Sequence, residues 1–358
     1  MRILETLPWA EIAAAMGAHV VGAPLSAPRG ASIDTRTLAP ADLFFALKGE
    51  RVDGHDHLQA ALEKGCSGVV IKDRARLIPG LFSLVVSDPE TALFELARLV
   101  RSRSSAHFVA ITGSAGKTSC KEFTAEVLRA EGPVLATKGN LNNHLGVPLT
   151  LMRLETDHWA AVIECGMSHP GELSRLARLI RPRVAAITNV AAAHLEFFDS
   201  VAQIAAAKAE IFETLSNGDT AVVPADEPLL RDRALKTSGS VYLFGEGPEA
   251  RVRAAGISMS LEGSTFELQS GGSRVAVHLS VPGPHAVSNF LAAAAIAEAL
   301  GVSAKAAAER APLLKSVGNR GAVKHLGDDI LLIDDSYNSN PKALLSAIDT
   351  LADRKSVV

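Results

Sequence analysis

The chain has 358 residues, of which 47% are hydrophobic and 21% are charged, so it has ample apolar material for a core and is not a disordered chain. Its 36 basic and 39 acidic side chains give a net charge of -3, which argues against broad electrostatic binding to nucleic acid or anionic membrane. At about 150 residues per domain, the length predicts two or three domains.

The cysteines and the apolar segments indicate where such a chain works. Cys66, Cys120 and Cys165 are scattered and form no Cys-x-x-Cys pair, which argues against a disulfide framework and a structural zinc site and fits a reducing cytoplasm. No segment reaches the roughly 18 apolar residues of a membrane span. The N-terminus carries the acidic Glu5 early and does not resemble a secretory signal. We therefore expect a cytoplasmic protein with no membrane span.

The first 104 residues predict a small α/β domain. Helical spacing covers residues 5–16, and a second helix is expected at 91–101. Apolar runs predict strands at residues 43–47, 69–71 and 84–86. The polar run at 101–105 is typical of a linker, so we expect the first domain to end near residue 104.

From residue 105 to about 311, strands alternate with helices. The expected strands cover residues 107–112, 134–136, 160–164, 184–188 and 220–224. The expected helices between them include residues 117–131, 172–180 and 201–215. This alternation predicts a parallel sheet covered on both faces. Three alternating stretches at 252–260, 265–269 and 274–281 predict an antiparallel patch, and an alanine-rich helix follows at 285–300.

A third unit begins after Pro312, with a strand expected at residues 330–333 and a helix at 342–351. It runs to residue 358, and some 45 residues are few for a domain with its own core. We therefore expect residues 312–358 to be the start of a truncated domain.

The strongest local signal is a glycine-rich segment between an apolar strand and a helix. Its sequence is Thr112-Gly113-Ser114-Ala115-Gly116-Lys117-Thr118. Glycines let backbone N–H groups approach phosphate oxygens, and the helix N-terminus adds partial positive charge. Lys117 suits the β- and γ-phosphates, and the Thr118 hydroxyl suits Mg²⁺. Two residues separate the glycines instead of the usual four, so this is a short variant of a phosphate loop. The alternative is a glycine-rich turn with a chance lysine, which the agreement of strand, glycines and helix disfavours.

Three further residues are candidates for the same edge of the sheet. Glu164 ends an expected strand, where it is either a Mg²⁺ ligand or water-positioning group, or an ordinary solvated acid. His194 follows the next strand and is either a metal ligand or a structural histidine. Lys208 lies among alanines on a helix, which is typical of a solvated lysine; near a metal it would instead pair with phosphate, or react when neutral with CO₂ to give an anionic carbamate.

Taken together, Thr112–Thr118, Glu164, His194 and Lys208 resemble, in order and context, the ATP-dependent Mur ligases of peptidoglycan synthesis, whose scaffold folylpolyglutamate synthetases share. Further stretches resemble the branch of that family that adds D-alanyl-D-alanine: residues 137–150 (TKGNLNNHLGVPLT), 334–341 (DDSYNSNP), 32–36 (SIDTR), 44–50 (FFALKGE) and 53–55 (DGH). The resemblance covers nearly the whole chain. It implies an α/β fold with three domains: an N-terminal uridine-nucleotide domain (1–104), a central P-loop parallel sheet (105–311) and an incomplete Rossmann-like C-terminal domain (312–358).

The resemblance also implies a reaction. ATP phosphorylates the free carboxylate of UDP-N-acetylmuramoyl-tripeptide, and the amine of D-alanyl-D-alanine attacks the acyl phosphate. The products are UDP-N-acetylmuramoyl-pentapeptide, ADP and phosphate, and the enzyme is expected to be a monomer. Two alternatives stay open: a truncated form that binds substrate without turnover, and a related amino-acid-adding ligase. A signalling or mechanical P-loop ATPase would not need the asparagine-rich or uridine-domain stretches.

The family's site residues carry over by matching position. Thr118 and Glu164 are expected to hold one Mg²⁺, and His194 with a carbamylated Lys208 a second. Arg320 is expected to reach the γ-phosphate, so the catalytic set is Lys117, Glu164, His194, Lys208 and Arg320. Asn289 is expected at the adenine and Asp335 at the nucleotide. The expected substrate contacts are Ser32, Thr35 and Arg36 for the uridine nucleotide, Asn140, Asn142 and Asn143 for the polar substrate, and Asn338 and Asn340 on the dipeptide side.

Some of these residues have plainer interpretations. Ser32–Arg36 can be a turn followed by a surface ion pair, Arg320 a solvated linker residue, and the asparagine-rich loop a set of turns. The chain also departs from the family at Ala286, where an asparagine is usual directly after the histidine of residues 282–289. That change is expected to weaken or reshape adenine recognition without removing it.

Overall fold

The computed structural model describes residues 1–191, 198–260, 262–316, 318, 322–326, 331–334 and 336. The chain forms two compact units: Met1–Ala106 with Thr137–His158, and His107–Ala136 with Trp159–Val358. The division into three domains ending near residues 104 and 311 stays a prediction.

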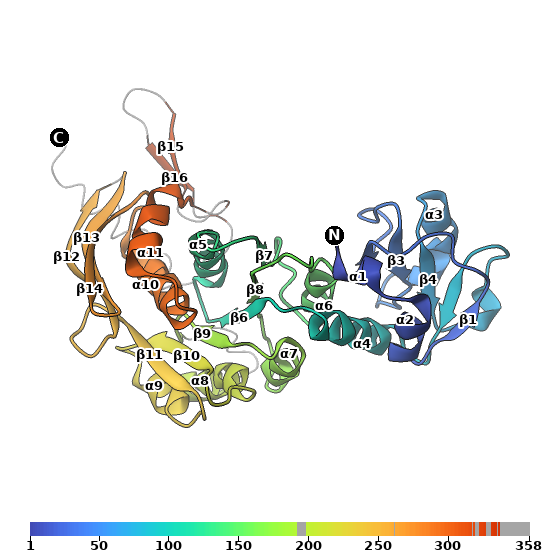
Figure 1. The fold of residues 1–358 in the computed structure, drawn as a ribbon, viewed down its shortest axis with the longest axis horizontal. Coiled ribbons are helices and arrows are strands. Elements are labelled where there is room, and N and C mark those ends of the chain that lie inside the picture. The colour runs from blue at the N-terminus through green and yellow to red at the C-terminus, as the bar shows by residue number, and fades with distance from the viewer. Residues whose placement is uncertain are drawn as a thin grey trace. The chain divides into compact units, whose positions relative to one another are not determined.

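The first unit is built on a five-stranded sheet in the order β1-β5-β4-β3-β2, parallel except for the edge strand β1 (Figure 1). The strands are β1 (His19–Val21), β2 (Gly30–Ser32), β3 (Asp42–Phe45), β4 (Gly68–Ile71) and β5 (Ser83–Val85). The helices are α1 (Ile3–Thr6), α2 (Trp9–Ala15), α3 (Leu58–Glu63) and α4 (Pro89–Ser102), with 3₁₀ turns η1 (Gly54–His57) and η2 (Arg74–Arg76). The expected strands and the second helix are therefore present.

The single helix expected at residues 5–16 is wrong, because the structure has two short helices, α1 and α2, with a break between them. Leu7 is extended (φ -83°, ψ 130°) and Pro8 precedes the first turn of α2. A proline disfavours helical backbone at the residue before it and cannot donate the N–H that a continuous helix needs. The apolar residues continue across the break because both helices contribute to the core, α1 with Ile3 and Leu4 and α2 with Ile12 and Ala13.

Residues 137–158 pack with the first unit, although they follow the second strand of the other unit's sheet. They contain α6 (Gly146–Leu151), whose six residues are all buried. The backbone N–H of Ile3 donates to the Leu154 carbonyl at 2.9 Å, and that of Thr156 to the Met1 carbonyl at 3.0 Å. The asparagine-rich stretch is thus part of the same compact unit as the Ser32–Arg36 segment.

The second unit contains a nine-stranded sheet in the order β14-β13-β12-β11-β10-β9-β6-β8-β7. Its strands are β6 (His107–Thr112), β7 (Val134–Ala136), β8 (Ala160–Glu164), β9 (Val184–Ile187), β10 (Thr220–Pro224), β11 (Ser240–Gly245), β12 (Val252–Ser260), β13 (Gly263–Ser270) and β14 (Ser273–Leu279). The strands from β7 to β12 are parallel, and β13 and β14 extend the sheet antiparallel. The predicted parallel sheet with an antiparallel patch is confirmed; β11 is an additional strand.

Helices cover both faces of this sheet, with α5, α10 and α11 on one face and α7, α8 and α9 on the other (Figure 1). Their bounds are α5 (Lys117–Leu128), α7 (Glu172–Ile180), α8 (Val201–Ala209), α9 (Pro228–Ala234), α10 (Pro284–Ala299) and α11 (Ala304–Arg310), with 3₁₀ turns η3 (Glu210–Phe212) and η4 (Ala311–Leu313). The small side chains of α10 are buried against α5 and the sheet, which lets the helix backbones approach closely.

A two-stranded antiparallel hairpin, β15 (Ala322–His325) and β16 (Leu331–Asp334), lies in the C-terminal part. The strand expected at residues 330–333 matches β16 within one residue, whereas the helix expected at 342–351 lies outside the described residues. Within the part of the chain that the structure describes, no helix is both long and apolar enough to cross a membrane.

Candidate functional site

The phosphate loop lies where the direction of the sheet's connections changes. The loop joins β6 to α5. In the sheet, β6 lies between β8 and β9, with β7 beyond β8 on one side and β10 beyond β9 on the other. Register pairs Ile111 of β6 with both Glu164 of β8 and Ala186 of β9, so the carboxyl ends of three strands meet at one edge. In parallel α/β sheets this switch point is where ligands bind.

The two glycines of the loop are required by their surroundings. Gly116 is left-handed (φ 77°), and a Cβ there would lie 2.5 Å from Oδ1 of Asn289. Gly113 has φ 154°, and a Cβ there would lie 1.9 Å from Oγ1 of Thr188. A side chain at either position would be strained and would collide with a neighbour. The loop therefore presents bare backbone at the start of α5.

Lys117 is the first residue of α5, and its Nζ donates a hydrogen bond to the Gly113 carbonyl at 2.8 Å. The amine thus folds back over the loop, where phosphate oxygens would compete for it. Thr118, the next residue, is buried. The first N–H groups of a helix have no intrahelical acceptor, so the start of α5 offers donors together with a cationic side chain.

Two residues that the sequence analysis did not choose as site residues, Thr188 and Asn189, hold the loop in place. Thr188 Oγ1 donates to the Ala115 carbonyl at 2.6 Å. The Asn189 side chain accepts from the Ala115 N–H at 2.9 Å and donates to the Ala115 carbonyl at 3.1 Å. The Ser114 N–H donates to the Asn189 carbonyl at 3.1 Å, and Ser114 Oγ bonds both polar backbone groups of Ala191. The signal available in the sequence was a Thr-Asn pair directly after a buried strand at this edge.

Glu164 and Lys208 are both buried, each with 2% of its surface exposed. Burial, and after it the positive charge of Lys117, lower the pKa of Lys208 to about 7. Lys208 is therefore not the solvated lysine of the plain interpretation. At neutral pH a substantial fraction of its amine is uncharged, as carbamate formation requires.

The residue types at this edge fit a hard divalent cation. Thr118 supplies a hydroxyl and Glu164 a buried carboxylate, and Mg²⁺ prefers oxygen ligands. Among the described residues, which do not include His194, no group of three His, Cys, Asp or Glu side chains is gathered closely enough to hold a metal ion. Any further ligands of such an ion would have to come from phosphate, water, a modified Lys208 or the undescribed part of the chain.

Two cysteines lie near this carboxylate. Burial, together with the charge of Glu164, raises the pKa of the Cys120 thiol to about 12. Burial and Glu164 also raise the pKa of Cys165 well above its ordinary range. Both thiols therefore stay protonated, and Cys66 is buried as well. None of the three behaves as a nucleophile or a metal-binding thiolate.

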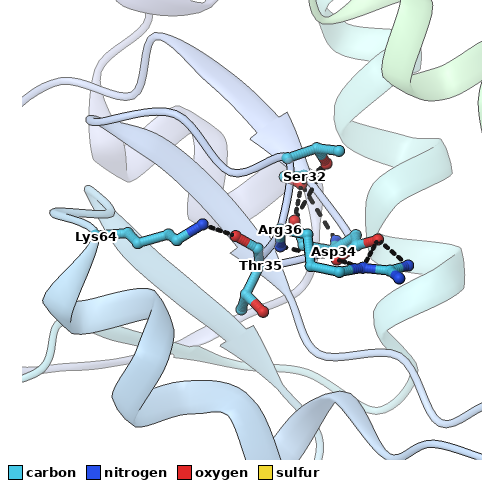
Figure 2. Close-up of polar contacts among 6 residues, drawn as sticks. Ser32, Asp34, Thr35, Arg36 and Lys64 are labelled. Carbon is cyan, nitrogen blue, oxygen red and sulfur yellow. Dashed lines mark hydrogen bonds and ion pairs between the residues drawn. The ribbon is translucent and has the colours of Figure 1, made fainter.

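In the first unit, the Ser32–Arg36 segment is a turn that orders an exposed guanidinium (Figure 2). The Asp34 carboxylate accepts two hydrogen bonds from Nε of Arg36 at 3.0 Å and one from its Nη2 at 2.7 Å. This pairing lowers the pKa of Asp34 and raises that of Arg36. Ser32 Oγ donates to the Asp34 carbonyl at 2.9 Å, and Lys64 Nζ donates to the Thr35 carbonyl at 2.6 Å. The surface ion pair of the plainer interpretation is therefore present, between Asp34 and Arg36. It fixes the Arg36 guanidinium, whose side chain is 89% exposed.

The asparagine-rich loop has a structural component. Asn143 Oδ1 accepts from the N–H groups of Leu145 at 3.2 Å and Gly146 at 2.8 Å, so it caps the start of α6. Asn140 is exposed and Asn142 half-buried. A Cβ at Gly146 would lie 2.4 Å from the Leu141 backbone, which explains a glycine at this point. Asn143 therefore shapes the loop, and Asn140 and Asn142 stay predicted substrate contacts.

The DGH stretch of the same unit is also structural. His55 is buried, its Nδ1 lies 2.7 Å from Oδ1 of Asp53, and its Nε2 accepts from the Lys72 N–H at 3.1 Å. These partners hold the His55 ring in place inside the unit.

The predicted residues His194, Arg320, Asp335, Asn338 and Asn340 lie outside the described residues. Asn289, expected at the adenine, has its amide beside Gly116 at the phosphate loop. Ala286 is buried in the first turn of α10. At this position a small apolar side chain replaces the asparagine that is usual in the family.

Known proteins match this chain over most of its length. The profile for the Mur ligase middle domain matches residues 111–297, and that for the Mur ligase family catalytic domain matches residues 29–115. A UDP-N-acetylmuramoyl-tripeptide–D-alanyl-D-alanine ligase of Escherichia coli is 41% identical over 322 residues, covering 89% of this chain and 71% of the relative.

Solved structures agree. MurF from Acinetobacter baumannii superimposes with a TM-score of 0.89 at 31% identity, covering 96% of this chain and 76% of that one. The MurF ligase of Thermotoga maritima in complex with ADP gives a TM-score of 0.81 at 28% identity, covering 90% of this chain and 74% of that one. With a phosphate loop at the switch point of its parallel sheet and matches that span both units, the chain belongs to the Mur ligase family.

Proposed function

We propose that this chain is an ATP-dependent ligase that joins D-alanyl-D-alanine to UDP-N-acetylmuramoyl-tripeptide in peptidoglycan synthesis. The observation that carries the proposal is the phosphate loop, set at the switch point of the sheet in a chain 41% identical to a ligase of that name. ATP phosphorylates the tripeptide carboxylate, the dipeptide amine attacks the acyl phosphate, and phosphate leaves. A related amino-acid-adding ligase is less well supported, because the solved structures that superimpose with TM-scores of 0.89 and 0.81 are MurF proteins.

The chain's own groups supply positioning and charge. Phosphoryl transfer gains most from fixed donors around the phosphates, which the start of α5 and Lys117 provide. Asn289, beside Gly116, lies where it can also contact the nucleotide. We propose Thr118 and Glu164 as ligands of one Mg²⁺ and His194 with a modified Lys208 as ligands of a second. Bound there, Mg²⁺ would neutralise charge on the phosphate oxygens.

Carbamylation of Lys208 is part of the proposal. The uncharged amine attacks CO₂, a C–N bond forms, and the nitrogen loses a proton, which leaves an anionic carbamate. Support comes from the burial of the side chain, its pKa of about 7 and its interaction with Lys117, because a carbamate would replace a like-charge contact by an opposite-charge one.

We propose the Ser32–Arg36 turn for the uridine nucleotide, since a fixed exposed guanidinium suits phosphate oxygens. The proposal includes three further pairs of contacts. They are Asn140 and Asn142 at the polar substrate, Arg320 and Asp335 at the nucleotide, and Asn338 and Asn340 at the dipeptide. A monomeric state and a cytoplasmic location stay predictions.

The test is phosphate release by the 358-residue chain. Release is expected with ATP, UDP-N-acetylmuramoyl-tripeptide and D-alanyl-D-alanine together, with the pentapeptide identified by mass spectrometry. Equal release with a single amino acid would move the chain to another Mur ligase activity. Calorimetric binding of the UDP substrate without any pentapeptide would establish the non-turnover alternative, and ATP hydrolysis independent of the UDP substrate would favour a simple ATPase.

A further inference from the structure

The phosphate loop relies on an outside support because it is short. Only Ser114 and Ala115 separate its glycines, so little chain is available to wrap around phosphates. Both residues are tied by hydrogen bonds to Thr188–Ala191, the segment that follows β9. Ala115 is held on both sides, because its N–H and its carbonyl each bond the Asn189 amide.

These bonds divide the loop into two parts. The N–H groups of Ser114 and Ala115 already donate to Asn189, so they point toward the segment after β9. Gly116 and the first residues of α5 follow at the helix N-terminus, where backbone N–H groups have no intrahelical acceptor and are oriented to donate to phosphate oxygens. The direction of these donors depends on how the Ala115–Gly116 peptide is turned. The Ala115 carbonyl, which belongs to that peptide, accepts from both Thr188 and Asn189.

We propose that Thr188 and Asn189 are positioning residues for nucleotide binding: by fixing the Ala115 carbonyl, they aim the backbone donors of Gly116 and the start of α5 at the phosphates. The inference rests on the proposed ATP-dependent function. It assigns a role to two residues that need not touch the nucleotide. Their loss should weaken nucleotide binding without affecting the uridine-nucleotide substrate, whose proposed site is in the other unit.

The substitutions are chosen to change hydrogen bonding and little else. Thr188→Val keeps the side-chain shape and removes the hydroxyl, whereas Thr188→Ser keeps the hydroxyl. Asn189→Asp keeps the acceptor for the Ala115 N–H but replaces the donor by a charged oxygen facing the Ala115 carbonyl. Thr214→Val is the matched control, because Thr214 Oγ1 also donates to a carbonyl, that of Ala177 at 3.4 Å, on the other face of the sheet.

Binding of Mg–ADP to the full chain is measured by calorimetry, and the KM values of ATP and of the UDP substrate are measured by phosphate release. We expect Thr188→Val to weaken Mg–ADP binding about tenfold, because one hydrogen bond is lost. Asn189→Asp should weaken it about a hundredfold, because a donor is replaced by a charged oxygen that faces the Ala115 carbonyl. Thr188→Ser and Thr214→Val should stay within about twofold of the parent chain. The KM of ATP should rise in parallel while that of the UDP substrate stays unchanged.

Calorimetry separates affinity from the fraction of folded protein, because unfolding lowers the stoichiometry. Variants that lose stoichiometry but keep the parent affinity would overturn the proposal, since Thr188 and Asn189 would then be merely structural. Parent-like affinity in Thr188→Val and Asn189→Asp would overturn it too. Failure of the parent chain itself to bind Mg–ADP would instead count against the proposed function.

Discussion

The phosphate loop and the Ser32–Arg36 turn are both proposed to meet phosphate oxygens, but they are built differently. The loop relies on backbone donors and a lysine, held among buried strands and by the segment after β9. The turn relies on one guanidinium, 89% exposed and held by the neighbouring Asp34. Buried, preorganised donors act strongly on bound charge, whereas an exposed cation is screened by water and salt. We therefore expect large, specific effects at the loop and small, salt-dependent effects at the turn.

The largest effect should come from Lys117→Ala. Removing the loop's charged donor is expected to lower kcat for phosphate release by about a hundredfold to a thousandfold, the cost of losing one transition-state donor. Binding of the UDP substrate, followed by calorimetry, should not change. Lys305→Ala removes an exposed lysine of α11 and should have no effect. If Lys117→Ala kept half of the parent activity, the contrast between loop and turn would fail.

Lys208→Met should alter both activity and the pH dependence of stability. Because burial lowers the pKa of Lys208 to about 7, the unfolded chain binds a proton between pH 7 and 10 that the folded chain lacks. The free energy of unfolding then rises with pH there, by up to about 1.4 kcal/mol per unit. The methionine variant should lose that slope and gain stability relative to the parent, most below pH 7. Its phosphate release should also be lost.

Denaturant unfolding at pH 6 to 10 in CO₂-free buffer measures this slope, since a carbamate would change the charge. Lys305→Met serves as the exposed control. Parallel stability curves for the parent and Lys208→Met would show that Lys208 titrates normally, and the argument for a readily carbamylated amine would lose its support.

Gly116→Ala tests whether this glycine is needed for nucleotide binding by the loop or only to allow a left-handed backbone angle. Gly218 is the matched control, because it is also left-handed (φ 95°) but has no atom within 4 Å of an added Cβ. Both alanine variants should lose about 1–2 kcal/mol of stability from the left-handed backbone. Only Gly116→Ala should also weaken Mg–ADP binding, by about tenfold, because its Cβ displaces Asn289. Equal ADP affinity in the two variants would contradict this.

The smallest effect is expected for Arg36→Ala. The KM of the UDP substrate should rise roughly fivefold at low salt, and the difference should shrink at high salt as screening removes the contribution of an exposed charge. Mg–ADP binding should not change. Arg98→Ala, which removes an exposed, ion-paired arginine of α4, is the control. A salt-independent loss, or one shared with Arg98→Ala, would argue against a phosphate contact at Arg36.

The sequence predicted the central sheet well because its buried parallel strands are short, continuous apolar runs. β6, β8 and β10 begin and end where expected. It predicted the phosphate loop because glycine, lysine and threonine stand close together in the chain. Asn189 was missed, since its partner Ala115 is 74 residues away and only the β6–β9 pairing brings them together. The buried state of Lys208 was likewise invisible in an alanine-rich helix whose composition gives no indication of depth.

The assignment of residues 137–158 depended on tertiary packing. Their asparagine-rich sequence gives no indication of which unit they pack against, yet α6 is buried in the first unit. Asn143 illustrates the same limit. Its place in a family-like stretch suggested a substrate contact, while its amide caps α6, a role that becomes visible only when the helix is seen.

The excursion of residues 137–158 has a consequence for modular exchange between relatives. The chain passes from one unit to the other at three places, after residues 106, 136 and 158. A chimera joined at residue 106 alone would combine α6 from one parent with the β2 and α4 surfaces of another, against which it packs. Exchange that preserves packing must therefore move residues 1–106 and 137–158 together, which leaves β6, the phosphate loop, α5 and β7 as an inherited insert between two transplanted pieces. Recombination within this family should accordingly favour exchanges with junctions at all three places over a single crossover.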